Sequence, residues 1–150
     1  MKKFKFRLTT LLQLREAARD ERRGLLAQAY LALEKLAEQR EAVEKQLAQT
    51  QSEHQHAAAP GPLNVDRLMN TNRFYLILRA ELQVLAQQTT AIEGEVEKRR
   101  QALIATDREV RVLEKLRDTQ QERYLESQAL VERKQLDEVA GRRIQMEDAS

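Results

Sequence analysis

A narrow apolar stripe in the second half of the chain limits its fold more than any other feature. Between residues 75 and 113 the positions of this stripe are spaced alternately three and four residues apart. They are Tyr75, Leu78, Leu82, Leu85, Thr89, Ile92, Val96, Arg99, Leu103, Thr106, Val110 and Leu113. Because such a repeat keeps one side of a helix against a neighbouring helix, the spacing predicts a coiled coil.

An earlier segment has the same rhythm. Its positions are Leu26, Ala29, Leu33, Leu36, Arg40, Val43 and Leu47, and they follow a looser cluster of Leu8, Leu11, Leu12 and Leu14. Between the two segments stand Pro60, Gly61 and Pro62, which remove two backbone donors and disfavour helix. The sequence therefore predicts an all-α fold, a long antiparallel two-helix coiled-coil hairpin with a C-terminal single-helix overhang. We expect a single coiled-coil domain over 1–150, with helices at about 5–57 and 65–146 and a turn at 58–64.

The expected register explains the overhang. A tight turn near residue 61 makes the numbers of facing residues sum to roughly 122 if both helices rise about 1.5 Å per residue. Residue 5 then faces a position near residue 117, where the stripe fades into Arg117, Gln120, Tyr124 and Ser127. The later residues have no partner in their own hairpin, and a single helix of this kind is marginally stable alone.

Charge is unevenly distributed along the chain, although the net charge is only +2. Residues 2–23 hold eight basic against three acidic residues, and residues 98–117 hold seven against three. Because these stretches should face each other, the open end of the hairpin is expected to be basic. Just beyond it an acidic ladder follows at intervals of four residues: Glu114, Asp118, Glu122 and Glu126. Like charges at this spacing disfavour a free helix.

Features of an enzyme are scarce. The four glycines are scattered singly, so no phosphate-binding loop is present, and the absence of cysteine excludes thiolate nucleophiles and disulfides. His54 and His56 with Glu53 form a possible metal-binding group, but solvated residues before a turn are the favoured interpretation. We predict no catalytic, cofactor-binding or metal-binding residues and no cofactor. Neither a secretory signal nor an apolar run of roughly 20 residues occurs, which favours a cytoplasmic protein.

Three parts of the sequence resemble the flagellar export protein FliJ family. These parts are "FKFRLTTLLQLREAARDER" at the start, the proline-broken hairpin, and "LEKLRDTQQERYLESQALVERKQLDEVAGRR" near the end, with "LDEVA" at Leu136 to Ala140. The resemblance implies a non-enzymatic protein of the flagellar type III export apparatus, similar to the central stalk of rotary ATPases. Its implied partners are the hexameric export ATPase, whose assembly and activity it would promote, the cytoplasmic part of the export gate, and export chaperones. The implied location is the inner face of the cell membrane at the flagellar base, with peripheral membrane association through the export apparatus.

The resemblance also directs attention to particular residues. The open end and the overhang would contact the ATPase, and the candidates are Arg7, Leu11, Arg15, Arg19, Arg111, Leu116, Arg117, Tyr124 and Leu136. Tyr124 is equally consistent with packing on its own helix. In "FYLIL", Phe74 and Leu78 match an aromatic and an aliphatic residue, one helical turn apart, at which the family docks to the export gate.

Two other classes of function use the same architecture. A generic cytoplasmic coiled-coil scaffold or tether needs only the stripe, and would bind no ATPase. A nucleic-acid-binding protein would use the basic end, where Phe4 and Phe6 stand among lysines. No nucleic-acid-binding motif is present and the charge is nearly balanced, so we expect no nucleic-acid partner.

Overall fold

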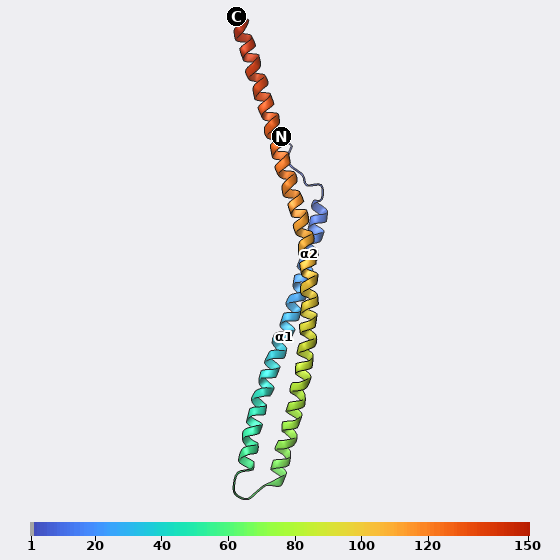
Figure 1. Ribbon diagram of the computed structural model, residues 1–150, viewed down its shortest axis with the longest axis vertical. Helices are drawn as coiled ribbons and strands as arrows, with labels where there is room; N and C mark the ends of the chain where they lie inside the picture. Colours follow the sequence, from blue (N-terminus) through green and yellow to red (C-terminus); the bar gives the residue numbers. More distant parts are fainter. Residues whose placement is uncertain (1) are drawn as a thin grey trace. The chain divides into compact units, whose positions relative to one another are not determined.

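The computed structural model describes residues 2–150 and consists of two helices, α1 (Thr9–Ala57) and α2 (Val65–Asp148) (Figure 1). No strand occurs in these residues. The chain forms two compact units: unit 1 comprises Met1–Asp20 and Ala105–Ser150, and unit 2 comprises Glu21–Ile104. Each helix contributes to both units. The predicted all-α fold of two long helices packed against each other is confirmed.

Unit 2 contains the turn and the two helical arms that meet it, side by side in Figure 1. Its core consists of Val43 from α1 with Leu78 and Leu85 from α2, and Leu36, Leu47 and Leu82 pack against them. All these residues belong to the predicted stripes. Their burial between two antiparallel helices removes apolar surface from water and is the main force holding the arms together.

Burial follows the predicted spacing closely. No position of the α2 stripe between residues 75 and 113 is exposed. In the α1 stripe the exception is Arg40, whose Nε donates to a Glu44 carboxylate oxygen at 2.9 Å on the outside of the helix. Arg99 keeps its place in the stripe differently, because its guanidinium donates to the backbone oxygen of Leu25 at 2.6 Å and to Glu95 at 2.9 Å. A charged residue is thus accommodated between the arms by hydrogen bonding.

The loop between the helices has defined ends. Asn64 caps α2, because its side-chain oxygen accepts a hydrogen bond from the backbone nitrogen of Arg67 at 3.2 Å. Gly61 has a φ of 146°, a conformation that favours glycine. Inside unit 2 the numbers of facing residues sum to 125 for His54 with Thr71 and to 124 for Leu25 with Arg99. The expected sum of 122 was slightly low, since the first turn of α2 lies beyond the end of α1.

Unit 1 contains a segment that the sequence analysis placed in a helix. Residues 2–8, here called the N-terminal arm, are not helical, and α1 begins at Thr9 rather than near residue 5. The Thr9 hydroxyl donates to the backbone oxygen of Phe6 at 2.6 Å, which stabilises the change from arm to helix. Phe6, Leu12 and the fully buried Val110 form the core of this unit, with Phe4, Leu8 and Leu113 packed around them.

The overhang is present but begins later than expected. The N-terminal arm contacts α2 as far as Tyr124, and every residue from 129 to 150 is exposed. An extended chain advances about 3.3 Å per residue and a helix about 1.5 Å, so the arm covers more of α2 than a helix of equal length. We call residues 125–150 the C-terminal segment. In the described part of the chain, neither helix is apolar over a length that would cross a membrane.

Candidate partner-binding surfaces

The N-terminal arm has two chemically different sides. Phe4, Phe6 and Leu8 are at least partly buried, whereas Lys3, Lys5 and Arg7 are exposed. This alternation is the period-two pattern of an extended chain lying on a surface. It was visible in "KKFKFRL" and was the signal that could have identified the arm from the sequence.

Tyr124 fixes the end of the arm. Its ring centroid lies 5.6 Å from that of Phe4, and its hydroxyl donates a hydrogen bond to the backbone oxygen of Lys2. The sequence analysis placed this side chain either against a partner or on its own helix, and in the structure it packs against the N-terminal arm instead. A partner at Tyr124 would therefore meet the arm as well.

The exposed side of the arm is a basic surface of unit 1. Among residues 2–150, Lys2, Lys3, Lys5 and Arg7 take part in no ion pair within 4.0 Å. Their charges are therefore available to an acidic partner without breaking an intramolecular pair. Attraction of this kind acts mainly on the rate of association and depends on salt.

The other arginines predicted to contact a partner already have acidic neighbours. Arg15 lies 2.9 Å from Glu109, and Arg111 lies 2.9 Å from Asp107. Likewise, Arg19 is 3.4 Å from Asp20 and Arg117 is 3.3 Å from Asp118. All four pairs lie in unit 1, where the contact of Arg15 with Glu109 joins α1 to α2. Surface pairs contribute about 0–1 kcal/mol, so a partner can exchange them at small cost.

Apolar candidates in unit 1 differ in exposure. Leu11 and Leu116 are 37% and 38% exposed, whereas Leu136 in the C-terminal segment is 69% exposed. Leu11 also lines a shallow groove between α1 and α2, and the other lining residues are Arg15, Arg108, Glu109, Val112 and Leu113. This groove combines apolar side chains with the Arg15–Glu109 ion pair, which suits a helix with a mixed polar and apolar side.

Near the start of α2, the two residues predicted to bind the export gate differ in exposure. Phe74 is 48% exposed, but Leu78 is 2% exposed and belongs to the core of unit 2. A partner cannot touch Leu78 without separating the helices. Leu76 and Ile77, which are 58% and 61% exposed, are the accessible aliphatic residues of this turn. The resemblance to the family indicated Leu78 by its position in the sequence. Because Leu78 is buried, the aliphatic side chains that a partner can reach are those of its neighbours.

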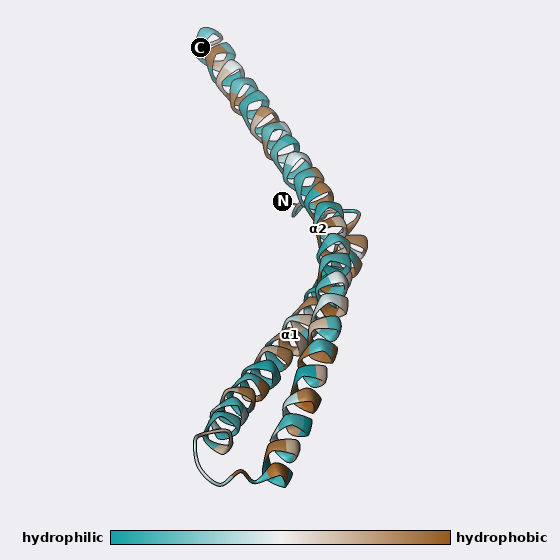
Figure 2. Ribbon diagram, turned by 60° about the horizontal axis from the view of Figure 1, so that its bottom comes forward, coloured by the Kyte–Doolittle hydropathy of each residue, from teal (hydrophilic) through white to brown (hydrophobic). Residues whose placement is uncertain are grey.

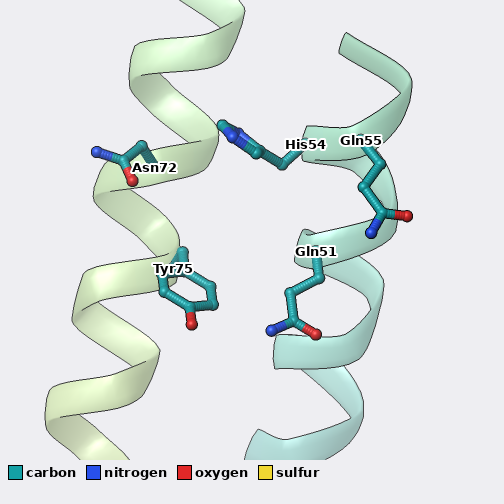
Figure 3. Close-up of a pocket in the computed structure, with 5 residues that line it drawn as sticks. All are labelled: Gln51, His54, Gln55, Asn72 and Tyr75. Atoms are coloured by element: carbon teal, nitrogen blue, oxygen red, sulfur yellow. The ribbon is translucent and has the colours of Figure 1, made fainter. Parts of the chain in front are cut away.

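A polar pocket lies between the helices of unit 2 close to the turn (Figure 3). It is lined by Gln51, His54, Gln55, Asn72 and Tyr75. The hydrogen bond from Arg79, at 2.9 Å, lowers the pKa of the Tyr75 hydroxyl; slight burial opposes this, and a hydrogen bond with Gln51 adds to it. His54 Nδ1 lies 3.1 Å from the Thr71 hydroxyl. In the described residues no group of three or more metal-ligating side chains comes together, there or elsewhere.

Comparison with known proteins identifies a family. The sequence profile of a family described as "Flagellar FliJ protein" matches residues 4–148. No curated protein and no solved structure matches the chain. The match includes residues 4–8 of the N-terminal arm, both helices and nearly all of the C-terminal segment.

Proposed function

The chain belongs to the flagellar FliJ family and is therefore a component related to flagellar protein export, and we propose that it is the non-enzymatic coupling stalk of that apparatus. The family match over residues 4–148 carries this proposal. In it the hexameric export ATPase is the principal partner, and the export gate and export chaperones are further partners. The site of action is the cytoplasmic face of the membrane at the flagellar base.

Two features of unit 1 support contact with a ring-shaped ATPase. The C-terminal segment is helical up to Asp148 and fully exposed from residue 129, so its surface is available to neighbouring subunits. The N-terminal arm presents Lys3, Lys5 and Arg7 to solvent. We assign the initial electrostatic contact to the arm and the apolar contact to the C-terminal segment.

The mechanism follows from the asymmetry of a two-helix stalk. Such a stalk presents different side chains in every direction, so six identical subunits around it cannot make identical contacts. Binding to the assembled ring favours the ring over its separate subunits, because a ligand stabilises the state that it binds. Unequal contacts favour different conformations in different subunits, which biases the order in which they hydrolyse ATP. The stalk itself needs no catalytic residue.

The gate-binding surface in this proposal is the exposed apolar side of α2 near the turn. Phe74 and Ile77, which are three residues apart and so lie on the same side of the helix, are its accessible residues, and the buried Leu78 packs in the core of unit 2. This surface belongs to unit 2, whereas the N-terminal arm and the C-terminal segment belong to unit 1. One molecule therefore has distinct residues for the gate and for the ATPase.

The experiment measures binding of the purified export ATPase to the immobilised full-length chain at several salt concentrations. Lys3→Glu with Lys5→Glu should weaken association by about tenfold at low salt and reduce the salt dependence. Lys35→Glu with Arg73→Glu is the matched control, because these exposed basic residues lie in unit 2 and, like the arm lysines, form no ion pair within 4.0 Å in the described residues. The control should bind as the unmodified chain does. Equal binding by both variants would remove the arm from the interface, and no binding by the unmodified chain would favour the scaffold or tether.

A further inference from the structure

The C-terminal segment carries an apolar stripe of its own. Its positions are again spaced alternately four and three apart, at Leu125, Ala129, Glu132, Leu136, Val139, Arg143 and Met146. The stripe that packs in unit 1 includes the half-buried Tyr124 near its end. The stripe of the C-terminal segment is displaced from it by one residue. Nothing in residues 2–150 covers it, since all its side chains are exposed, and hydrophobic residues recur at intervals along this helix in Figure 2.

The stripe is complementary to itself when reversed. In two antiparallel helices that cross midway between Leu136 and Val139, Leu136 of each copy faces Val139 of the other. In the same arrangement Ala129 faces Met146, and Glu132 faces Arg143. Antiparallel coiled coils pack the two alternating core positions against each other in this way. The only charged residues of the stripe thus meet as opposite charges.

We propose that the C-terminal segment pairs with the same segment of a second copy of this chain in an antiparallel two-helix coiled coil. A parallel pair is disfavoured, because it would place Glu132 against Glu132 and Arg143 against Arg143 in the core. A shallow groove lies at the centre of the proposed interface, lined by Glu132, Gln135, Leu136 and Val139. The groove is positioned to receive the Leu136 and Val139 side chains of the second copy.

The pairing is expected to be weak and reversible. Only Leu136 and Val139 give purely aliphatic contacts at the centre, and each Glu132–Arg143 pair must lose hydration when it is covered. Glu126 also approaches Glu147 of the second copy at the edge, which adds a like-charge contact. We expect a dissociation constant on the order of 10 to 100 µM, corresponding to a small interface with few apolar layers. A single exposed helix of this length is marginal alone, so pairing also stabilises the segment.

The inference does not rest on the proposed function, since it uses only the stripe and its charges. Where both hold, a second copy and the ATPase would use the same side of the segment. Pairing would then keep the segment covered until the ATPase displaces the second copy. The ATPase would bind one chain at a time.

Sedimentation velocity over about 1 to 300 µM tests the association directly. Glu132→Arg and Arg143→Glu should each weaken it by about tenfold, because each creates like-charge contacts. The double variant, Glu132→Arg with Arg143→Glu, should restore it. Glu138→Arg and Lys134→Glu make equal charge changes on the opposite side of the helix and should leave it unchanged. A monomer at every concentration, or no restoration in the double variant, would overturn the proposal.

Cysteine cross-linking tests the orientation, and the chain has no native cysteine to interfere. In the antiparallel pair, a mixture of Ala129→Cys and Met146→Cys chains should form a mixed disulfide on mild oxidation. Ala129→Cys alone should not, because the two copies of residue 129 would be about 25 Å apart at 1.5 Å per residue. Rapid cross-linking of Ala129→Cys alone would refute the antiparallel arrangement. Dimers that persist in a chain ending at Gln128 would refute the location.

Discussion

Leu78 and Ile77 provide a matched pair for testing how the arms of unit 2 are held together. They are adjacent in α2 and similar in size, but Leu78 is 2% exposed and Ile77 is 61% exposed. Leu78→Ala removes a side chain that contacts the core formed with Val43 and Leu85. Ile77→Ala removes the same number of carbon atoms, but from a side chain that is exposed to water.

The magnitude follows from the burial. Truncation of a buried leucine costs about 2 to 5 kcal/mol, depending on how far its surroundings close the cavity. Unit 2 is only two helices thick, so water reaches such a cavity and the side chains around it can relax. We therefore expect the low end, about 2 kcal/mol for Leu78→Ala, and less than about 0.5 kcal/mol for Ile77→Ala. A change of about 2 kcal/mol lowers the melting temperature of a chain of this size by about 4 to 8 °C.

Circular dichroism at 222 nm during heating, with urea unfolding in parallel, measures both variants. The assay must include helix content before heating, since a loss there would show that the arms had already separated. Equal destabilisation by the two variants would refute the assignment of Leu78 to the core. It would equally refute the assignment of Ile77 to the accessible surface for the export gate.

Three further predictions test other parts of the structure. Gly94→Ala should raise the free energy of unfolding by about 0.5 to 1 kcal/mol in urea titrations, because a Cβ there meets nothing within 4 Å and alanine favours helix; a destabilised variant would show that this position is packed. Phe6→Ala should increase amide hydrogen exchange in residues 9–20 of α1 while leaving the turn of unit 2 unchanged, since Phe6 packs in the core of unit 1; unaltered exchange would contradict the placement of the arm. Arg79→Met should raise the pKa of Tyr75, because the phenolate loses the hydrogen bond that favours it. Ultraviolet titration of a chain in which Tyr30 and Tyr124 are replaced by phenylalanine measures this pKa, and an unchanged value would show that Arg79 is not the cause of the shift.

The helical pairing could be predicted from the sequence because it depends on a repeated spacing. The positions from Tyr75 to Leu113 are buried or half-buried wherever the rhythm placed them, including the polar Thr89 and Thr106. Even Arg99 occupies its position, with its charge hydrogen-bonded to the backbone of α1. A periodic signal over many heptads averages out individual exceptions, which is why the general architecture was accessible.

The N-terminal arm was missed because its signal is short. Phe4, Phe6 and Leu8 alternate with basic residues over only a few positions, and the helical leucines that follow immediately suggested an earlier helix start. The sequence also could not show which of the candidate arginines already form ion pairs within the chain. Arg15 and Glu109 lie 94 positions apart, so their ion pair depends on a register that the turn fixes only within a few residues.

ATP hydrolysis by the export ATPase, titrated with this chain, tests the central claim most directly. The proposal predicts that the chain increases the rate of ATP hydrolysis, because its binding to the assembled ring would favour the ring over its separate subunits. A chain ending at Gln128 should keep its thermal stability, since every removed residue is exposed, and should lose most of the stimulation. Full stimulation by a stably folded truncated chain, or no stimulation by the full-length chain, would contradict the account.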